Sequence, residues 1–214
     1  WKEELPPAEF IPIVESMKLG NELNEFVIKQ VVHDFTNHVK INSSFKLAIN
    51  LSFGAEQFQK NILKLAQLLV NSGLSTDLQF EFEITEGNVL LRDTTNSLLL
   101  KDLSDQLKKE GVSLAIDDFG TKQSSMNRII ECNFNTIKID QCYIDRLDSK
   151  ESKEVSAVIK ATLSLAKDLN MTVIAEGAER QQQLTMLKRL GLKYVQGFVL
   201  SKPLPADELN KLLN

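Results

Sequence analysis

The stretch SLAIDDFG, residues 113–120, decides how this sequence is interpreted. It begins like a buried strand and ends in two adjacent carboxylates, Asp117 and Asp118, followed by Phe-Gly. Like charges side by side repel, and a carboxylate near a core is costly to desolvate unless something neutralises it. A lone Asp-Asp after a strand is most often a helix N-cap or a solvated turn. The pair therefore has to be weighed together with the ends of the other strands.

Strand-like and helix-like segments alternate along the 214-residue chain, without a linker or a low-complexity tract. Helical spacing is found at residues 7–16, 22–38, 55–70, 95–110, 124–131, 153–169, 180–190 and 206–213. Strand character is found at residues 45–52, 78–85, 112–118, 136–140, 172–177 and 193–201. The alternation predicts an α/β domain with a parallel sheet, either a doubly wound open sheet or a (β/α)8 barrel. Because the Gly-rich turn of dinucleotide-binding folds and the GxxxxGK[ST] loop are absent, a (β/α)8 barrel without its N-terminal part fits better.

A polar side chain stands at the C-terminal end of each predicted strand. In chain order these residues are Asn50, Glu83, the pair Asp117 and Asp118, Lys138, Glu176 and Gln196. In a (β/α)8 barrel all of these ends meet at the rim that carries active sites. Several carboxylates gathered there would repel one another unless cations neutralise them, and an all-oxygen ligand set suits Mg²⁺ or Mn²⁺. Adjacent aspartates also suit a pair of metal ions, a recurrent arrangement for phosphoester hydrolysis.

Each of these positions also has an ordinary structural explanation. Glu81, Glu83 and Glu86 could form an exposed strand face that runs into a turn. Lys138 and Asp140 could form a surface ion pair that contributes little stability. Asn50 and Ser52 could form an Asx-type turn. Six successive strand ends with the same character favour the functional interpretation.

Composition limits the classes of function and environment. The formal net charge of −4 and the pI near 5.4 argue against a general nucleic-acid binder. A small anionic ligand is compatible with this charge only if cations mediate its binding. No apolar run approaches a membrane span. Two cysteines without metal-type spacing favour free thiols in a reducing compartment. His33 and His38 lie five apart in a helical stretch, which predicts different helix faces and a poor metal pair.

The chain resembles the EAL-domain family of bacterial cyclic di-GMP phosphodiesterases. The resemblance rests on seven motifs in the family's order: PAEFIPIVE at 7–15, NLS at 50–52, EITE at 83–86, DDFGT at 117–121, KID at 138–140, AEGAE at 175–179 and QGFVLSKPLP at 196–205. It implies a modified (β/α)8 barrel that hydrolyses one phosphodiester bond of cyclic di-GMP to give linear pGpG.

The resemblance also implies a role for each matching residue. Asn50, Glu83 and Asp117 would bind a first metal ion, and Asp117, Asp118 and Glu176 a second. Lys138 would hold the attacking water, and Gln196 would orient water near the metals. Glu86 would anchor the loop after Asp118, which in this family links metal binding to dimer contacts. Ser201, Lys202 and Pro203 would lie beside a guanine.

The sequence departs from the family pattern in two places. The Glu-Ala-Leu strand, with its metal-binding Glu and a phosphate-contacting Arg, would precede Trp1, so we expect residues 1–214 to be a single EAL domain truncated at its N-terminal end. The family's DDFGTGYSS loop reads DDFGTKQSS here, with Lys122 in place of a glycine and Gln123 in place of an aromatic residue. These changes bear on the loop that would order the second metal ion.

Two functions therefore follow from the sequence. One is an active, metal-dependent phosphodiesterase. The other is a catalytically inactive EAL domain that binds cyclic di-GMP or a protein partner. For either function the resemblance implies a homodimer, fusion to sensor or GGDEF domains, and a cytoplasmic location in a protein that upstream segments could anchor to a membrane.

Overall fold

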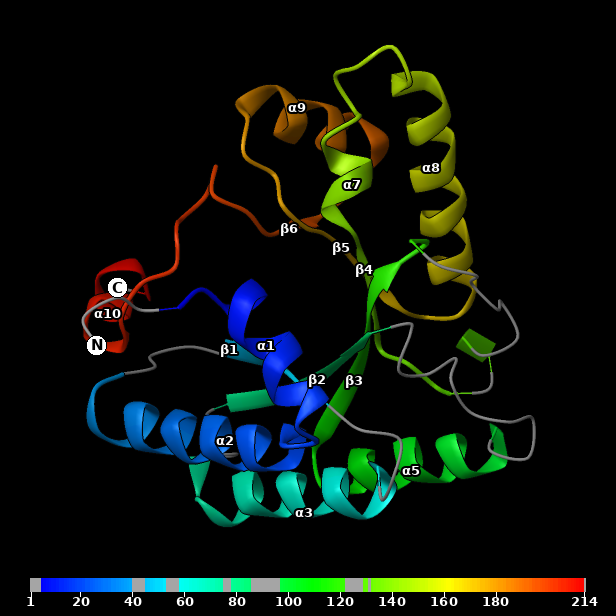
Figure 1. Ribbon diagram of the computed structural model, residues 1–214. Coiled ribbons are helices and arrows are strands. Elements are labelled where there is room, and N and C mark those ends of the chain that lie inside the picture. Colours follow the sequence, from blue (N-terminus) through cyan, green and yellow to red (C-terminus); the bar gives the residue numbers. More distant parts are fainter. Residues whose placement is uncertain are drawn as a thin grey trace. The chain divides into compact units, whose positions relative to one another are not determined.

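The computed structural model describes residues 5–39, 45–52, 58–74, 78–85, 97–121, 129–130 and 132–213. The helices in these ranges are α1 (Pro7–Ser16), α2 (Gly20–Asn37), α3 (Phe58–Asn71), α5 (Ser97–Lys109), α7 (Gln141–Ile144), α8 (Ser152–Asp168), α9 (Gln181–Leu190) and α10 (Ala206–Leu213) (Figure 1). The strands are β1 (Phe45–Asn50), β2 (Leu78–Thr85), β3 (Val112–Phe119), β4 (Thr136–Ile139), β5 (Thr172–Ala175) and β6 (Tyr194–Val195). They confirm the predicted alternation of strands and helices.

The six strands form one sheet in chain order, β1-β2-β3-β4-β5-β6. From β3 to β6 the pairing is parallel, with Ala115 opposite Thr136, Lys138 opposite Ile174 and Ala175 opposite Val195. Parallel neighbours need a crossover connection, and helices supply it here, for example α8 between β4 and β5. The predicted parallel sheet is therefore confirmed for these strands.

The contacts divide the chain into two compact units. The first consists of Trp1–Phe82, Asp105–Val112 and Ala206–Asn214. In it α2 and α3 lie side by side (Figure 1), and Ile28 and Ile62 on these helices are completely buried. The second unit consists of Glu83–Ser104 and Ser113–Pro205.

A close approach of backbones shapes the start of α2 in the first unit. A Cβ atom added to Gly20 would lie 2.7 Å from the carbonyl oxygen of Ser52. The side chain of Asn24 donates to that same oxygen at 2.8 Å and accepts from the Ser52 N–H at 3.0 Å. The Ser52 N–H is thus bonded to Asn24, and not to Asn50 as an Asx-type turn would require.

The end of α2 differs from the sequence-based expectation. His33 and His38 were expected on different helix faces, yet their ring centroids are 5.6 Å apart. The physical reason is that α2 ends at Asn37, so His38 is the C-cap residue, with φ −122° and ψ −32°. A spacing rule for a continuous helix does not apply to that residue.

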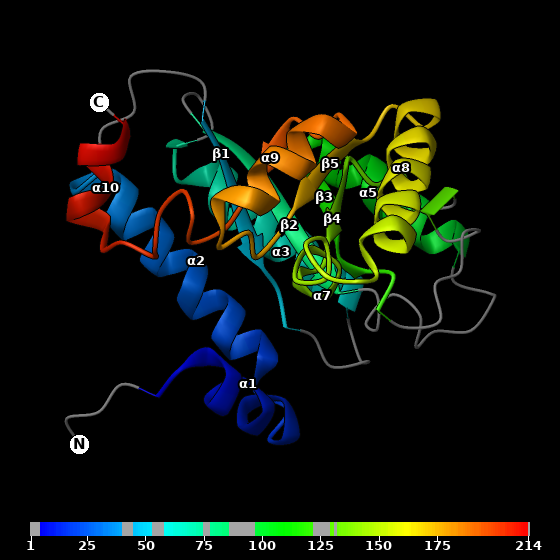
Figure 2. The same ribbon diagram turned by 90° about the horizontal axis from the view of Figure 1, so that it is seen from above.

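Strand β4 is the most deeply buried strand of the second unit. All four residues of β4 are buried, as expected for the centre of a parallel sheet. Helix α8 packs against β5 and also lies next to α9 (Figure 2).

Gly111 and Gly191, the predicted helix stops, have the left-handed backbone conformation, with φ of 77° and 94°. Among the described helices, none combines the length and apolar character that a bilayer crossing needs.

Candidate functional site

The ammonium group of Lys138 is surrounded by three carboxylates in the second unit. Its Nζ lies 2.6 Å from Glu83 Oε1, 2.6 Å from Glu176 Oε1 and 3.7 Å from Asp117 Oδ1. The Lys138 side chain is only 2% exposed, and the three acids are 4–16% exposed. Glu83 is therefore not part of an exposed strand face, and Lys138 is not part of a surface ion pair with Asp140.

Parallel strand order explains why residues so distant in sequence meet. Glu83 lies near the end of β2, Asp117 near the end of β3 and Lys138 near the end of β4. Glu176 follows β5 directly, and its N–H donates to the carbonyl of Ile139 at 3.0 Å, which extends the ladder between β4 and β5. The C-terminal ends of these strands thus carry the cluster, as predicted.

A bulge redirects the two aspartates at the end of β3. The register with β4 shifts between Ile116 and Phe119, and a bulge of this kind changes the direction of a side chain. Asp118 has φ 56°, an uncommon value for a residue other than glycine, and its N–H donates to Asp117 Oδ1 at 3.0 Å. Strained backbone of this kind clusters at functional sites.

The segment after the aspartates is fixed by contacts that sequence reasoning missed. The Tyr143 hydroxyl, on α7, donates to the Gly120 carbonyl at 2.6 Å. Gly120 has φ 89°, and a Cβ there would lie 2.8 Å from that hydroxyl. The Thr121 side chain donates to the Asp118 carbonyl at 2.9 Å. A glycine after Asp-Asp-Phe was a usable signal for positive φ, whereas nothing in the sequence pointed to Tyr143.

Helix α7 was not predicted, and Asp140 has a role in forming it. Its carboxylate accepts from the Cys142 N–H at 2.8 Å and so caps the short helix. Asp140 therefore helps to place Tyr143, which lies on α7 next to Gly120.

The cluster carries an excess of negative charge. Among the described side chains, three carboxylates face one ammonium when every group is ionised. Burial opposes the charge of Lys138, but the attraction of Glu83, Glu176 and Asp117 outweighs it and raises the pKa of Lys138 to about 12. Burial, assisted by repulsion from Asp117 and opposed by Lys138, raises the pKa of Glu176 to about 8. Lys138 is therefore charged at neutral pH, while Glu176 retains its proton most of the time.

This arrangement fits divalent cations. The acidic side chains supply only oxygen atoms, and one lysine does not balance them. Burial raises the pKa of Glu176 to about 8 even with the Lys138 ammonium beside it, and a bound cation would further favour the ionised carboxylate. Oxygen ligands without imidazole or thiolate suit Mg²⁺ and Mn²⁺.

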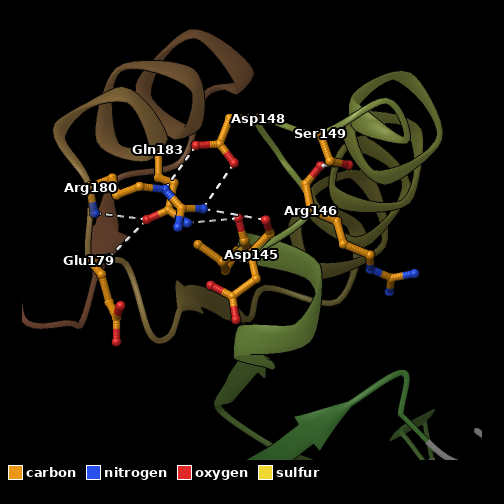
Figure 3. A network of polar contacts seen from close by, with 8 residues as sticks. Asp145, Arg146, Asp148, Ser149, Glu179, Arg180 and Gln183 are labelled. Carbon is orange, nitrogen blue, oxygen red and sulfur yellow. Dashed lines mark hydrogen bonds and ion pairs between the residues drawn. The ribbon is translucent and has the colours of Figure 1, made fainter.

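The loop that carries Glu176 is held on two sides. On one side, the Gln196 N–H donates to the Ala175 carbonyl at 2.8 Å and the Ala178 N–H donates to the Gln196 carbonyl at 3.2 Å. On the other side, the buried Gln183 side chain accepts from the N–H groups of Glu179 and Arg180, both at 2.9 Å (Figure 3). The loop is thereby bound to β6 and to α9.

The remaining candidates differ in their exposure. Asn50 ends β1 in the first unit and is exposed. The side chains of Gln196, Lys202 and Pro203 are exposed, and Ser201 is half-buried, with its hydroxyl donating to the Lys202 carbonyl at 2.8 Å. Glu86, Lys122 and Gln123 lie outside the described residues, as does most of the helix predicted at 124–131.

Comparison with protein families identifies the family of this chain. The family model of the EAL domain matches residues 1–203. The chain belongs to the EAL-domain family. The modified (β/α)8-barrel class of α/β fold predicted from the sequence is thereby confirmed.

Curated relatives and a solved structure extend this result. The EAL chain is 32% identical over 216 residues to the oxygen sensor protein DosP of Escherichia coli K12, covering 98% of this chain and 26% of DosP. It is 31% identical over 214 residues to the probable cyclic di-GMP phosphodiesterase PdeN of the same organism, covering 98% of this chain and 39% of PdeN. A solved structure of the PaMucR phosphodiesterase in complex with c-di-GMP is similar with a TM-score of 0.76 at 30% identity, covering 96% of this chain and 81% of that one. The EAL chain thus spans well under half the length of these two curated relatives.

Proposed function

We propose that this EAL chain hydrolyses one phosphodiester bond of cyclic di-GMP to linear pGpG with the help of two divalent cations. The observation that carries the proposal is the buried group of Glu83, Asp117 and Glu176 around Lys138. Its excess negative charge fits cations, and cations in turn attract an anionic phosphodiester.

The metal ligands follow from the family match. In this proposal Asn50, Glu83 and Asp117 hold one ion, and Asp117, Asp118 and Glu176 hold the other. When bound, Mg²⁺ or Mn²⁺ supplies activation of water and neutralisation of phosphate charge.

Lys138 has a defined part in this chemistry. Because its pKa is about 12, its ammonium remains protonated and cannot act as a general base at neutral pH. It can donate hydrogen bonds to a water molecule and stabilise negative charge that develops on the phosphate. Glu176 has a pKa of about 8, so a cation that binds its carboxylate can displace the proton.

Further residues complete the proposed site by family match. Gln196 would orient water, and Ser201, Lys202 and Pro203 would contact a guanine. Glu86 would anchor the loop after Asp118.

The setting of the activity is also proposed. PdeN is named a probable cyclic di-GMP phosphodiesterase, and a structure of Vibrio cholerae LapD contains GGDEF and EAL domains together with bound c-di-GMP. By resemblance to the family we propose a homodimer, within a longer protein that carries sensor or GGDEF domains. The two cysteines, Cys132 and Cys142, lack metal-type spacing, which supports a reducing compartment such as the cytoplasm.

The test is hydrolysis by the purified protein, including any residues that precede Trp1 in its gene. We expect cyclic di-GMP to be converted to pGpG with Mg²⁺ or Mn²⁺ and not with EDTA, as measured by chromatography and mass spectrometry. Lys138→Met and Glu176→Gln should each lower kcat at least about 100-fold, a typical loss for a group that stabilises the transition state.

Matched exposed substitutions on α8, Lys153→Met and Glu154→Gln, should leave the rate unchanged. Tight binding of cyclic di-GMP without turnover in the presence of metal would overturn the proposal and identify an inactive binding module.

A further inference from the structure

We infer that the side chains of His33, Asp34 and His38, at the C-terminal end of α2, form a binding site for a divalent ion of the zinc class. One ligand atom from each of these three residues lies within 4.8 Å of the other two. The site belongs to the first unit and uses none of the residues of the proposed phosphodiesterase site.

The end of the helix brings the two imidazoles together. In a continuous helix, residues five apart point about 140° away from each other. His38 escapes this geometry because its φ of −122° takes the chain out of the helix. The two rings end in an edge-to-face arrangement with centroids 5.6 Å apart.

The backbone of His38 is held firmly in this position. Its N–H donates to the Asp34 carbonyl at 2.7 Å, and the next residue, the buried Val39, donates to the same carbonyl at 3.1 Å. The side chain of Asn210, on α10, donates to the His38 carbonyl at 2.5 Å. A fixed backbone lowers the entropy that metal binding must overcome, because only exposed side-chain torsions remain to be ordered.

A hydrogen bond to Asp34 and the dipole of α2 also favour binding of a cation. Gln30 donates to Asp34 Oδ1 at 2.9 Å, which orients the carboxylate and leaves its second oxygen for a metal ion. The last turn of α2, Asp-Phe-Thr-Asn, contains no lysine or arginine, and the C-terminal end of a helix favours positive charge.

The ligand set points to zinc-class metals rather than Mg²⁺. Two imidazoles and one carboxylate match the ligands of Zn²⁺, Ni²⁺ or Cu²⁺, and three protein ligands leave a fourth tetrahedral position for water. Zn–N bonds of about 2.0–2.1 Å need the ligand atoms to lie closer to one another than 4.8 Å, and rotation of the exposed His33 and His38 rings can supply the movement.

The test is a zinc titration of the tag-free chain. Excess Mg²⁺ is added to compete with zinc for the carboxylates of Glu83, Asp117 and Glu176. Because the chain has only two histidines, its imidazole NMR spectrum reports on this site alone. We expect both imidazoles to shift together at one equivalent of ZnCl₂, while Mg²⁺ alone moves neither. By calorimetry, His33→Ala and His38→Ala should each weaken zinc binding at least about ten-fold.

Two controls address other ligands. Cys142 is exposed, but burial of its thiol group, with Asp140 beside it, raises the pKa of Cys142 to about 11, so the thiol is a poor ligand at neutral pH. Cys142→Ser should therefore bind zinc at the histidines as tightly as the parent. Glu176→Gln should do the same, because Glu176 belongs to the second unit and the histidines to the first. Circular dichroism verifies that each variant is folded.

Three results would overturn the inference. They are zinc binding without movement of both imidazoles, unchanged affinity in the two histidine variants, and loss of zinc binding in Cys142→Ser.

Discussion

Lys138 shows how a charged residue can occupy the middle of a buried strand. Its neighbours on β4, Ile137 and Ile139, are core residues, and it is as buried as they are. Desolvation alone would favour the neutral amine, and the surrounding carboxylates reverse that preference. Removing the ammonium would take away the positive charge that Glu83, Asp117 and Glu176 contact.

This imbalance predicts a strong effect of Lys138→Met on the metal-free protein. The free energy of unfolding should fall by about 3–5 kcal/mol, as found when one partner of a buried ion pair is removed. Added Mg²⁺ should recover part of the loss, because a cation would neutralise the same carboxylates. Urea unfolding followed by circular dichroism, with EDTA and with Mg²⁺, measures both effects. Lys153→Met on exposed α8 should change stability by less than about 0.5 kcal/mol. A metal-free Lys138→Met variant as stable as the parent would contradict the argument.

Glu176 predicts that metal binding depends on pH. Its pKa of about 8 lies above the ordinary glutamate value of 4.5, so between these values the folded protein holds more protons than the unfolded chain. In the absence of metal, this group therefore makes the fold less stable as pH rises from 4.5 to 8. A cation that needs the carboxylate must displace the proton, so Mg²⁺ affinity should rise up to about ten-fold per pH unit below pH 8.

Calorimetry in buffers with different ionisation enthalpies would count the protons released on Mg²⁺ binding. Release near pH 7 should disappear in Glu176→Gln. If the parent releases no proton there, the raised pKa is not linked to the metal site.

The buried side-chain amide of Gln183 connects helix α9, helix α7 and the loop that precedes α9. Gln183 on α9 accepts from the N–H groups of Glu179 and Arg180 and donates to the Ile144 carbonyl, on α7, at 3.1 Å (Figure 3). Arg180 adds two contacts to the Asp148 carboxylate, at 2.8 and 2.9 Å, but its side chain is 47% exposed. The buried amide and the exposed ion pair should therefore differ greatly in their effect on stability.

The expected order is that Gln183→Leu destabilises far more than Arg180→Ala. Gln183→Leu removes three hydrogen bonds made by a buried side chain, each expected to contribute roughly 0.5–1.5 kcal/mol. Loss of the exposed ion pair should cost about 0–1 kcal/mol. Urea unfolding compares the two variants, and amide hydrogen exchange should show faster exchange at Glu179 and Arg180 in Gln183→Leu. Equal destabilisation would contradict the argument, because the exposed ion pair would then contribute as much stability as the buried amide.

The grouping of the strand ends was predictable from the sequence. The bulge at Asp117 and helix α7 were not. Apolar strands that finish in Glu83, Asp117, Lys138 and Glu176 reveal a shared sheet edge, because parallel strand order forces those ends together. The bulge at Asp117 and the four-residue helix α7 depend on tertiary contacts such as the Tyr143–Gly120 hydrogen bond, which has no periodic signal. His38 was misjudged for a related reason, since the end of a helix is its least predictable part.

At the scale of the whole molecule, net charge constrains how the proposed substrate binds. The chain carries a formal charge of −4 at pH 7, and the carboxylate cluster adds local negative charge around Lys138. Cyclic di-GMP has two anionic phosphodiester groups. Like charges on protein and ligand oppose association unless cations lie between them.

Cyclic di-GMP should therefore bind tightly only when divalent cations are present. Removing Mg²⁺ with EDTA should weaken binding at least about ten-fold, equivalent to about 1.4 kcal/mol, because the phosphates would then face uncompensated carboxylates. Calorimetry with a hydrolysis-resistant phosphorothioate analogue separates binding from turnover. Glu154→Gln removes one exposed negative charge on α8 and should leave the metal dependence unchanged. Equal affinity with Mg²⁺ and with EDTA would mean that protein cations such as Lys138 and Lys202 recognise the phosphates without metal, so the carboxylate cluster would need another explanation.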